Sequence, residues 1–307
     1  MGDAPQQRFE IETTDRAPDD TPALTIGMPV FNGARYIRSS IDSILSQSFG
    51  DFELIVSDNA STDDTEAIVR SIAAQDPRVR YRRNAENIGL SPNFNLLVPR
   101  ARGRFFKWAT ADDLIRKGFL DRCIAQLEAE PDVVLAYAAA DFVDGDGNRL
   151  DLEDPGWHLV SDDPSRRLRA AISADHFVNA VLGVIRTDAL RRTRLLARYP
   201  GNDYRLMAEL SLLGKFVEIP DRLYVRRIHE GSSKGNTGNE RWMRAYHAGA
   251  RPGVRAAYWR LCRDRAGVII GAPVPMTDKV RLLAVLARLM VTDRVRLYRD
   301  LMDLLRS

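Results

Sequence analysis

The sequence predicts an α/β protein whose mostly parallel sheet is flanked by helices, followed by a helical C-terminal region. Between residues 24 and 129, β-rich apolar runs alternate with amphipathic helical patterns. The connections between these segments are short, which favours parallel strands joined by crossover helices. From about residue 239 onward the pattern is almost entirely helical. These three observations define the expected architecture.

The first half contains four strand–helix units in order. Strands are expected at LTIGMPVF (24–31), at the start of 52–65, at VRYRR (79–83) and at FFKWAT (105–110). Helices are expected over 34–48, over 66–75, within 84–98, and from Leu114 to about residue 129. The first helix places Ile37, Ile41, Ile44 and Leu45 on one face, which is the periodicity of a helix packed on a sheet.

The second half is less regular. Residues 133–150 predict a strand and a hairpin closed by Asp144-Gly145-Asp146-Gly147. Residues 151–200 are Arg-rich and predict helix with little strand. Residues 201–233 predict a loop, a helix, a strand, a turn, a second strand and a glycine/serine-rich loop.

Composition excludes several classes of protein. The 307 residues are 28% charged with a net charge of +3, and we find no basic tract or zinc-finger spacing typical of nucleic-acid binding. No apolar run reaches the ~20 residues of a membrane span. Residues 1–23 are polar and acidic, which predicts a disordered leader without a signal peptide. Cys123 and Cys262 are expected to be buried thiols, and the protein to be cytoplasmic.

Polar residues follow each predicted parallel strand. Because ligands of such sheets bind beyond the carboxyl ends of the strands, these residues are expected to meet at one edge. They are Asn32, Asp58, Asn59, Asn87, Asp112 and Asp113. The adjacent aspartates pose a choice: like charges disfavour joint ionisation unless a cation lies between them. Either a metal ion binds there, or Asp113 caps the helix expected from Leu114.

The run from PVFNGARY to SDNASTDDT resembles the N-terminal signature of the family 2 glycosyltransferases. Its components are a strand ending in Pro and Asn, the helix segment SILSQ, and a strand closing on Asp before a Ser-Thr-Asp turn. Asn87-x-Gly89 and the aspartate pair follow in order. The resemblance is dense over about 24–114 and returns at 201–233. It implies the Rossmann-like GT-A fold and a nucleotide-sugar-dependent enzyme.

The resemblance also implies a nucleotide site. Asp58 matches the aspartate that accepts a hydrogen bond from the base, and Pro29 and Asn32 lie on the same edge. Arg83 and Asn87, with Arg82, are expected to approach the nucleotide. Ser61, Thr62 and Asp63 are interpreted as a structural helix N-cap. The donor implied is a UDP- or dTDP-sugar.

The metal site implied by the resemblance contains Asp112, Asp113 and His229. Thr110 stands where many members have an earlier aspartate, so the pair itself is left to bind Mn²⁺ or Mg²⁺. Asp112 is also expected to contact the donor through the cation.

Asp203, in the pair Asn202-Asp203 that opens a helix, matches the catalytic base of an inverting transfer. The loop GSSKGNTGNERW, with Lys234 and Arg241, is expected to be a lid over the donor.

The chain is therefore divided into a leader (1–23), a nucleotide-sugar-binding half (24–114), an acceptor-binding and catalytic half (115–238) and a C-terminal helical region (239–307). The amphipathic stretch 278–307 is expected to pack on the catalytic domain or a second subunit. Its alternative role is peripheral attachment to the inner face of an anionic membrane, against which Asp293, Asp300 and Asp303 argue. The acceptor is a hydroxyl of a glycan, a lipid-linked glycan or another molecule.

Three other functions would require different features in the sequence. A nucleotidyltransferase needs a Gly-rich basic loop after the first strand, where this chain has only Gly33 and Arg35. A NAD-dependent oxidoreductase needs GxGxxG there, which is absent. A catalytically degenerate nucleotide-sugar-binding protein would be consistent with Thr110 and Asn202. Turnover of the donor distinguishes an enzyme from that third alternative.

Overall fold

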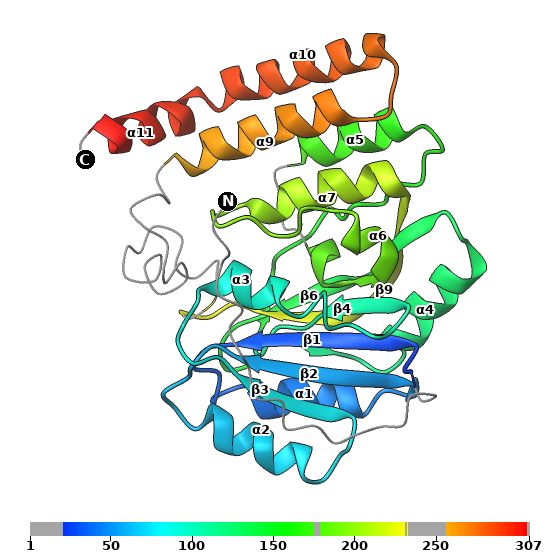
Figure 1. Cartoon of the computed structure of the whole chain (residues 1–307), viewed down its shortest axis with the longest axis vertical. Coiled ribbons are helices and arrows are strands. Elements are labelled where there is room, and N and C mark those ends of the chain that lie inside the picture. The colour runs from blue at the N-terminus through cyan, green and yellow to red at the C-terminus, as the bar shows by residue number, and fades with distance from the viewer. Residues whose placement is uncertain (1–20, 175–178, 231, 233–255, 306–307) are drawn as a thin grey trace, which may run out of the picture.

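The computed structural model describes residues 21–174, 179–230, 232 and 256–305, and the structural statements below concern these residues. Nine strands form one sheet that is flanked by helices (Figure 1). The strands are β1 (Leu24–Val30), β2 (Phe52–Asp58), β3 (Val79–Arg83), β4 (Phe105–Trp108), β5 (Leu114–Ile115), β6 (Val133–Val143), β7 (Arg149–Leu150), β8 (Val184–Arg186) and β9 (Lys215–Arg227). All but three residues of the expected leader lie outside the described residues.

The sheet has the order β3-β2-β1-β4-β8-β6-β9-β5, with β7 added to β6. β1 is parallel to β2 and β4, β2 to β3, and β6 to β9. β8 is antiparallel to both β4 and β6, so β6 runs in the same direction as β4. Six strands therefore point the same way, and their carboxyl ends share one edge of the sheet.

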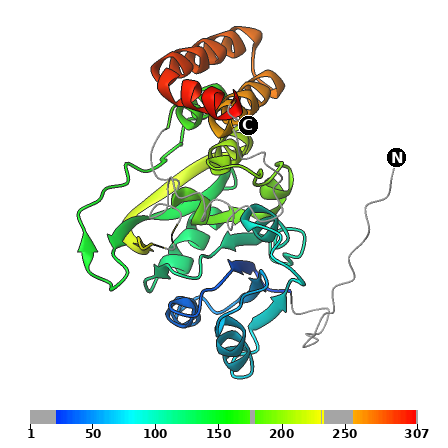
Figure 2. The same ribbon diagram turned by 90° about the vertical axis from the view of Figure 1, so that its left-hand side faces the viewer.

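Helices cover the sheet and then build a second layer away from it. The helices are α1 (Ile37–Leu45), α2 (Thr65–Ala73), α3 (Leu90–Asn95), α4 (Phe119–Ala129), α5 (Pro164–Ser173), η1 (Asn179–Leu182), α6 (Thr187–Arg191), α7 (Asn202–Leu213), α9 (Ala257–Gly271), α10 (Met276–Thr292) and α11 (Arg294–Leu305). α5 and α7 pack together, α9 packs on α7, and α10 packs on α5 and α9. Figure 2 shows the C-terminal helices gathered at one end of the molecule.

The buried core accounts for the clear strand pattern in the sequence of the first half. Every residue of β1 and β2 is buried, as expected of parallel strands covered on both faces. Pro29 is tolerated in this central strand because of its position. Gly27 accepts a bond from Ala109 on the β4 side, and β4 pairs no further than Gly27. The nitrogen of Pro29 faces the same side beyond that pairing, so the strand loses no ladder bond.

The helix expected from Leu114 begins later. Leu114–Ile115 is the short strand β5, antiparallel to Tyr224 and Val225 of β9. Gly118 then adopts φ +88° and starts α4 at Phe119. Asp113 therefore does not cap a helix, which removes the capping alternative for the aspartate pair.

Other boundaries also differ from the expectations. Residues 151–200 contain the central strand β8, and 151–158 are irregular. The expected strand–turn–strand after α7 is the continuous strand β9, with irregular pairing to β6 around Ala139. The stretch 278–305 forms two helices divided at Asp293, and α10 packs on α5 and α9 as expected.

Two expectations from composition can be compared with the structure. Cys123 and Cys262 are buried free thiols, as predicted. Within the described ranges, none of the helices combines the length and apolar character that crossing a bilayer would require.

Candidate active site

The predicted site residues gather at the edge formed by the carboxyl ends of the parallel strands. Asn32 follows β1, Asp58 ends β2 and is followed by Asn59, and the loop with Asn87 follows β3. The aspartate pair follows β4, and His229 follows β9. The polar residues between positions 32 and 113 therefore lie along one edge, as the strand pattern predicted, and His229, which the resemblance indicated, lies with them.

Helix α1 holds the turn that carries the aspartate pair. The Ser40 hydroxyl lies 2.8 Å from the Thr110 carbonyl and 2.7 Å from the Asp113 carbonyl. Ser43 accepts a bond from the Ile115 amide, and the Gln47 amide group donates to the Arg116 carbonyl. Ser40, together with Ser43 and Gln47 of SILSQ, thus anchors the backbone that follows β4.

Asp113 is turned into the protein. Its carboxylate accepts hydrogen bonds from the Thr110 hydroxyl (2.6 Å), the Tyr224 hydroxyl (2.6 Å) and the Arg227 amide (2.8 Å). Burial, reinforced by the neighbouring Asp112, raises the pKa of Asp113. Both carboxylate oxygens of Asp113 therefore accept hydrogen bonds from within the protein, and Asp113 links the turn after β4 to β9.

Lys107 lies beneath this turn and is fully buried. Its ammonium group donates to the carbonyl oxygens of Trp108 and Leu182 and lies over the rings of Phe119 and Tyr224. Burial lowers the pKa of Lys107 to about 8. A buried cation of this kind, whose charge also acts on Asp113, offsets part of the negative charge of the aspartate pair.

Asp112 faces outward and meets His229. The Asp112 carboxylate lies 2.9 Å from Nε2 of His229, and these side chains are 27% and 18% exposed. The His229 ring packs on Tyr36 with 4.8 Å between ring centroids. The Arg227 guanidinium carbon lies 4.7 Å from the centroid of the same Tyr36 ring. Arg227 also donates a hydrogen bond to the Asp112 carbonyl at 3.1 Å.

This pair has the chemistry of a divalent-cation site. A carboxylate oxygen and an imidazole nitrogen converge from β4 and β9, and both are ligands that Mn²⁺ accepts. Among the described residues there is no group of three His, Cys, Asp or Glu side chains that could hold a metal ion. Two protein ligands leave coordination positions for diphosphate oxygens and water, which suits a cation that binds with its substrate.

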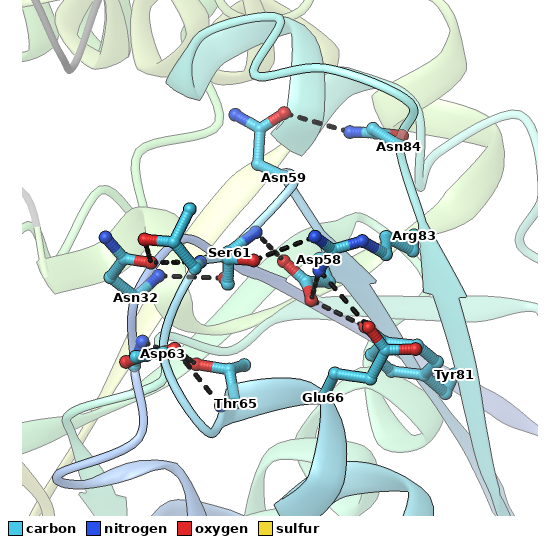
Figure 3. Close-up of polar contacts among 12 residues, drawn as sticks. Asn32, Asp58, Asn59, Ser61, Asp63, Thr65, Glu66, Tyr81, Arg83 and Asn84 are labelled. Atoms are coloured by element: carbon cyan, nitrogen blue, oxygen red, sulfur yellow. Dashed lines mark hydrogen bonds and ion pairs between the residues drawn. The ribbon is translucent and has the colours of Figure 1, made fainter.

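The end of the edge where a nucleotide was predicted to bind is built around Asp58 (Figure 3). Asp58 is fully buried and accepts bonds from the Ser61 amide (2.8 Å), the Tyr81 hydroxyl (2.5 Å) and Arg83 (3.0 Å). Arg83 also donates to the Ser61 carbonyl and lies 3.4 Å from Glu66. Burial and the hydrogen bond to Asp58 raise the pKa of Tyr81 well above its ordinary value.

The loops after β1 and β2 are locked together. Asn32, with φ +52°, donates its amide to Ser61 and accepts a bond from the Thr62 amide (Figure 3). Asp63 accepts from the Ala34 amide at 3.0 Å and from Thr65. The predicted N-cap is wrong in its position, because α2 begins at Thr65 after Asp64, which makes no side-chain capping bond. These residues are structural, as predicted, but they join two loops.

Asn87 is held by a network of amide side chains. It accepts a bond from Asn59 at 2.8 Å, and Asn59 also accepts one from Asn84 at 3.0 Å. Arg82 points elsewhere. It lines a shallow pocket with Ser57 and Arg100, and burial together with the charges of Arg100 and Arg80 lowers its pKa. Arg82 and Arg83 therefore lie on opposite faces of β3.

Asp203 lies in the first turn of α7 and is partly buried. Its carboxylate accepts a bond from the Tyr204 amide at 3.1 Å, and burial raises its pKa. The charge of Arg226 lowers the pKa of both Asp203 and Asp113. Arg226 therefore connects, through its charge, the helix that carries Asp203 with the turn that carries the aspartate pair.

Sequence reasoning did not identify Tyr36, Tyr224, Arg226 and Arg227 as site residues. A signal was present in LYVRRIH, where Tyr224 and Arg226 alternate with Arg227 and His229, so the two sets face opposite sides of the strand. Tyr36 had no comparable signal, because its contacts with His229 and with the Gly145 carbonyl (3.2 Å) depend on the fold. Lys234 and Arg241 of the expected lid lie outside the described residues.

Comparison with known proteins gives a consistent family. A family model described as Glycosyl transferase family 2 matches residues 25–192, more than half of the chain. Chondroitin synthase from Escherichia coli is 26% identical over 226 residues, which cover 73% of this chain and 31% of that protein. An uncharacterized glycosyltransferase from Haemophilus influenzae is 24% identical over 224 residues, covering 69% of this chain and 67% of that protein. The match therefore spans less than a third of the synthase.

Solved structures show the same GT-A fold. S. aureus TarS 1-349, in complex with UDP-GlcNAc, has a TM-score of 0.67 and 18% identity, covering 88% of this chain and 72% of that chain. The mannosyltransferase PcManGT from Pyrobaculum calidifontis, in complex with GDP-Man and Mn²⁺, has a TM-score of 0.51 and 20% identity. That likeness covers 97% of this chain and 89% of the other. The expected mostly parallel sheet with C-terminal helices is confirmed.

Proposed function

This chain belongs to glycosyltransferase family 2, and we propose that it transfers a sugar from a UDP- or dTDP-sugar to an acceptor hydroxyl, with inversion and with a divalent cation. Residues 24–114 would hold the donor, and 115–238 would supply the base and the acceptor surface. The C-terminal helices would support the second half. The single observation that carries this proposal is the meeting of Asp112 with His229 at the edge where the parallel strands end.

The base and the diphosphate of the donor would occupy different parts of this edge. Asp58 and Arg83 would lie at the nucleotide end. Asp58 is fully buried here, so it would accept a hydrogen bond from the base in place of one of its present donors, and Arg83 would hold its carboxylate in place. Pro29 and Asn32 would shape the adjoining loops, and Asn87 the loop after β3. UDP in the TarS complex supports a uracil donor here.

Asp112 and His229 would hold Mn²⁺ or Mg²⁺ together with the donor diphosphate, while Asp113 orients the turn. When bound, the cation supplies positive charge against the negative charge that grows on the leaving diphosphate. Arg227 steadies this end by its bond to the Asp112 carbonyl. The Mn²⁺ named with PcManGT supports a cation of this kind.

Asp203 would act as the general base. Its carboxylate takes the proton of the acceptor hydroxyl as that oxygen forms a bond to the anomeric carbon. The bond between the anomeric carbon and the diphosphate oxygen breaks, and the nucleoside diphosphate leaves. A raised pKa makes the Asp203 carboxylate a stronger base than an ordinary aspartate. The name of chondroitin synthase supports a glycan hydroxyl as the acceptor.

Calorimetry of UDP binding with Mn²⁺, with Mg²⁺ and with EDTA tests the donor site. The wild-type chain is expected to bind UDP in the presence of a cation and to lose most of that affinity in EDTA. Asp112→Ala is expected to abolish the difference between metal and EDTA. Asp42→Asn, which changes an exposed carboxylate on α1, is the matched control and should bind as the wild type does.

Two results would contradict the proposal. Equal UDP affinity with and without a cation would exclude a metal-assisted donor site at Asp112. Metal-dependent UDP binding that Asp112→Ala leaves intact would place the cation on other residues.

A further inference from the structure

The C-terminal helices carry most of the exposed apolar surface. Of the eleven large hydrophobic side chains that are exposed in the described residues, eight lie on α9, α10 and α11. They include Met276, Val280, Val291, Val295 and Tyr298, each at least 60% exposed. Single exposed hydrophobic residues are ordinary, but a concentration of this kind on one layer marks an interaction surface.

The exposed residues form a stripe along α10. Val280, Ala284, Ala287 and Val291 are exposed at spacings of four, three and four residues, which place them on one helical face. Leu282 and Leu286, on the opposite face, are buried. Val295 and Tyr298 are exposed on α11, just beyond the break at Asp293. The helix thus has one apolar face against the protein and a second one turned outward, which we call the outer stripe.

Three aspartates in or between α10 and α11 have partners within the C-terminal helices. Asp293 accepts a bond from the Tyr258 hydroxyl, and Asp300 accepts from the Tyr258 amide at 2.8 Å. Asp278 is paired with Arg281 at 3.1 Å. Arg288 and Arg294 are exposed beside the outer stripe. The aspartates at 293 and 300, which argued against membrane attachment in the sequence, are therefore engaged with α9.

We propose that the outer stripe is a surface for peripheral binding to an anionic lipid bilayer. Apolar side chains that insert between headgroups, flanked by arginines that meet anionic lipids, are the two components of interfacial attachment. Charge complementarity favours an anionic bilayer as the occupant, because Arg288 and Arg294 are exposed beside the stripe while Asp293 and Asp300 are bonded to Tyr258 of α9.

Helix α9 connects the outer-stripe helices with the helix that carries Asp203. A Cβ at Gly201, next to Asn202 and Asp203, would lie 3.8 Å from Leu261 of α9. Two residues earlier, the Trp259 indole donates to the Leu297 carbonyl of α11. One helix, α9, therefore contacts both α7, which carries the proposed base, and the α10 and α11 layer that would face the bilayer. If the proposed role of Asp203 holds, the acceptor hydroxyl belongs to a lipid-linked molecule.

Cosedimentation of the full chain with vesicles tests the surface without donor or acceptor. We expect binding to vesicles of phosphatidylcholine with a quarter phosphatidylglycerol, and much weaker binding to phosphatidylcholine alone. The double variant Val280→Asp/Val291→Asp should weaken binding about tenfold or more. Arg288→Gln/Arg294→Gln should weaken it about five-fold per arginine. Val160→Asp, at a 42% exposed valine outside these helices, is the control.

The results of these experiments distinguish a lipid bilayer from a second copy of this chain as the partner of the outer stripe. Binding to anionic vesicles that Val280→Asp/Val291→Asp leaves unchanged, in a variant with wild-type circular dichroism, would overturn the proposal. A dimer in lipid-free sedimentation velocity that Val291→Asp dissociates would make the outer stripe a subunit interface instead. Because no nucleotide is present, failure here says nothing against the donor site, and loss of UDP binding says nothing against this surface.

Discussion

Neighbouring carboxylates at positions 112 and 113 have different surroundings although they share a turn. Asp113 is buried under three hydrogen-bond donors from Thr110, Tyr224 and Arg227. Asp112 is partly exposed and meets one imidazole. The sequence presents the two as equivalent, because their difference comes from β9, which lies more than 100 residues away in the chain.

Asp203→Asn is expected to reduce transfer by about 10²- to 10⁴-fold, since general-base catalysis contributes that much. UDP binding should be unchanged, because the donor residues lie elsewhere. A radiolabelled transfer or donor-hydrolysis assay, paired with calorimetry, measures both quantities. Near-normal transfer by this variant would remove Asp203 from the mechanism.

The pH dependence of transfer is a second test of the role of Asp203. Burial raises the pKa of Asp203 above its ordinary value, so the acidic limb of kcat/KM should lie above that value. A group whose pKa is raised on folding stabilises the fold below its unfolded pKa, and that stability is lost as pH rises through the folded pKa. At neutral pH, Asp203→Asn should therefore raise stability by about 1 kcal/mol.

At the scale of elements, Gly118 sets where α4 begins. A Cβ there would meet no atom within 4 Å, so the cost of a side chain comes from the backbone at φ +88°. Gly118→Val should lower the free energy of unfolding by about 1–2 kcal/mol. Denaturant unfolding measures it against Gly267→Ala, an exposed position within α9 with open space, where a gain of about 0.5–1 kcal/mol is expected. An equal loss of unfolding free energy in Gly118→Val and Gly267→Ala would contradict this explanation.

The accuracy of the sequence predictions follows the range of the forces that shape each element. The strands β1 to β4 and the helices α1 to α3 have strong local periodicity, and their boundaries agree with the prediction to within a few residues. The helix predicted from Leu114 begins at Phe119, because β5 precedes it. β5 and β8 are short and exist through pairing with β9, β4 and β6, so no local pattern marks them.

The same division applies to the site. Asn32, Asp58 and Asp112 follow directly from strand ends, which a periodic pattern locates. Tyr36 and Arg226 act through packing between distant segments, and the sequence around them indicates only an exposed helix start and an alternating strand.

For the whole molecule, donor binding should raise thermal stability. Five strands contribute to the proposed site, so a ligand there binds only the folded chain. With UDP and Mn²⁺ at about 100 times their dissociation constant, stabilisation is about 2.7 kcal/mol. That corresponds to about 5 °C for a chain of this size. Differential scanning calorimetry should record this shift in the wild type and in Asp42→Asn, and lose its Mn²⁺-dependent part in Asp112→Ala.

The two ends of the sheet have a consequence for how the chain survives at high concentration. One end is β3, whose VRYRR sequence contains three arginines, and the other is β5, which is only two residues long. Charged or very short edge strands resist pairing with strands of another molecule. The sheet is therefore protected from growing into fibrous aggregates, and a concentrated solution of this protein should stay free of cross-β material.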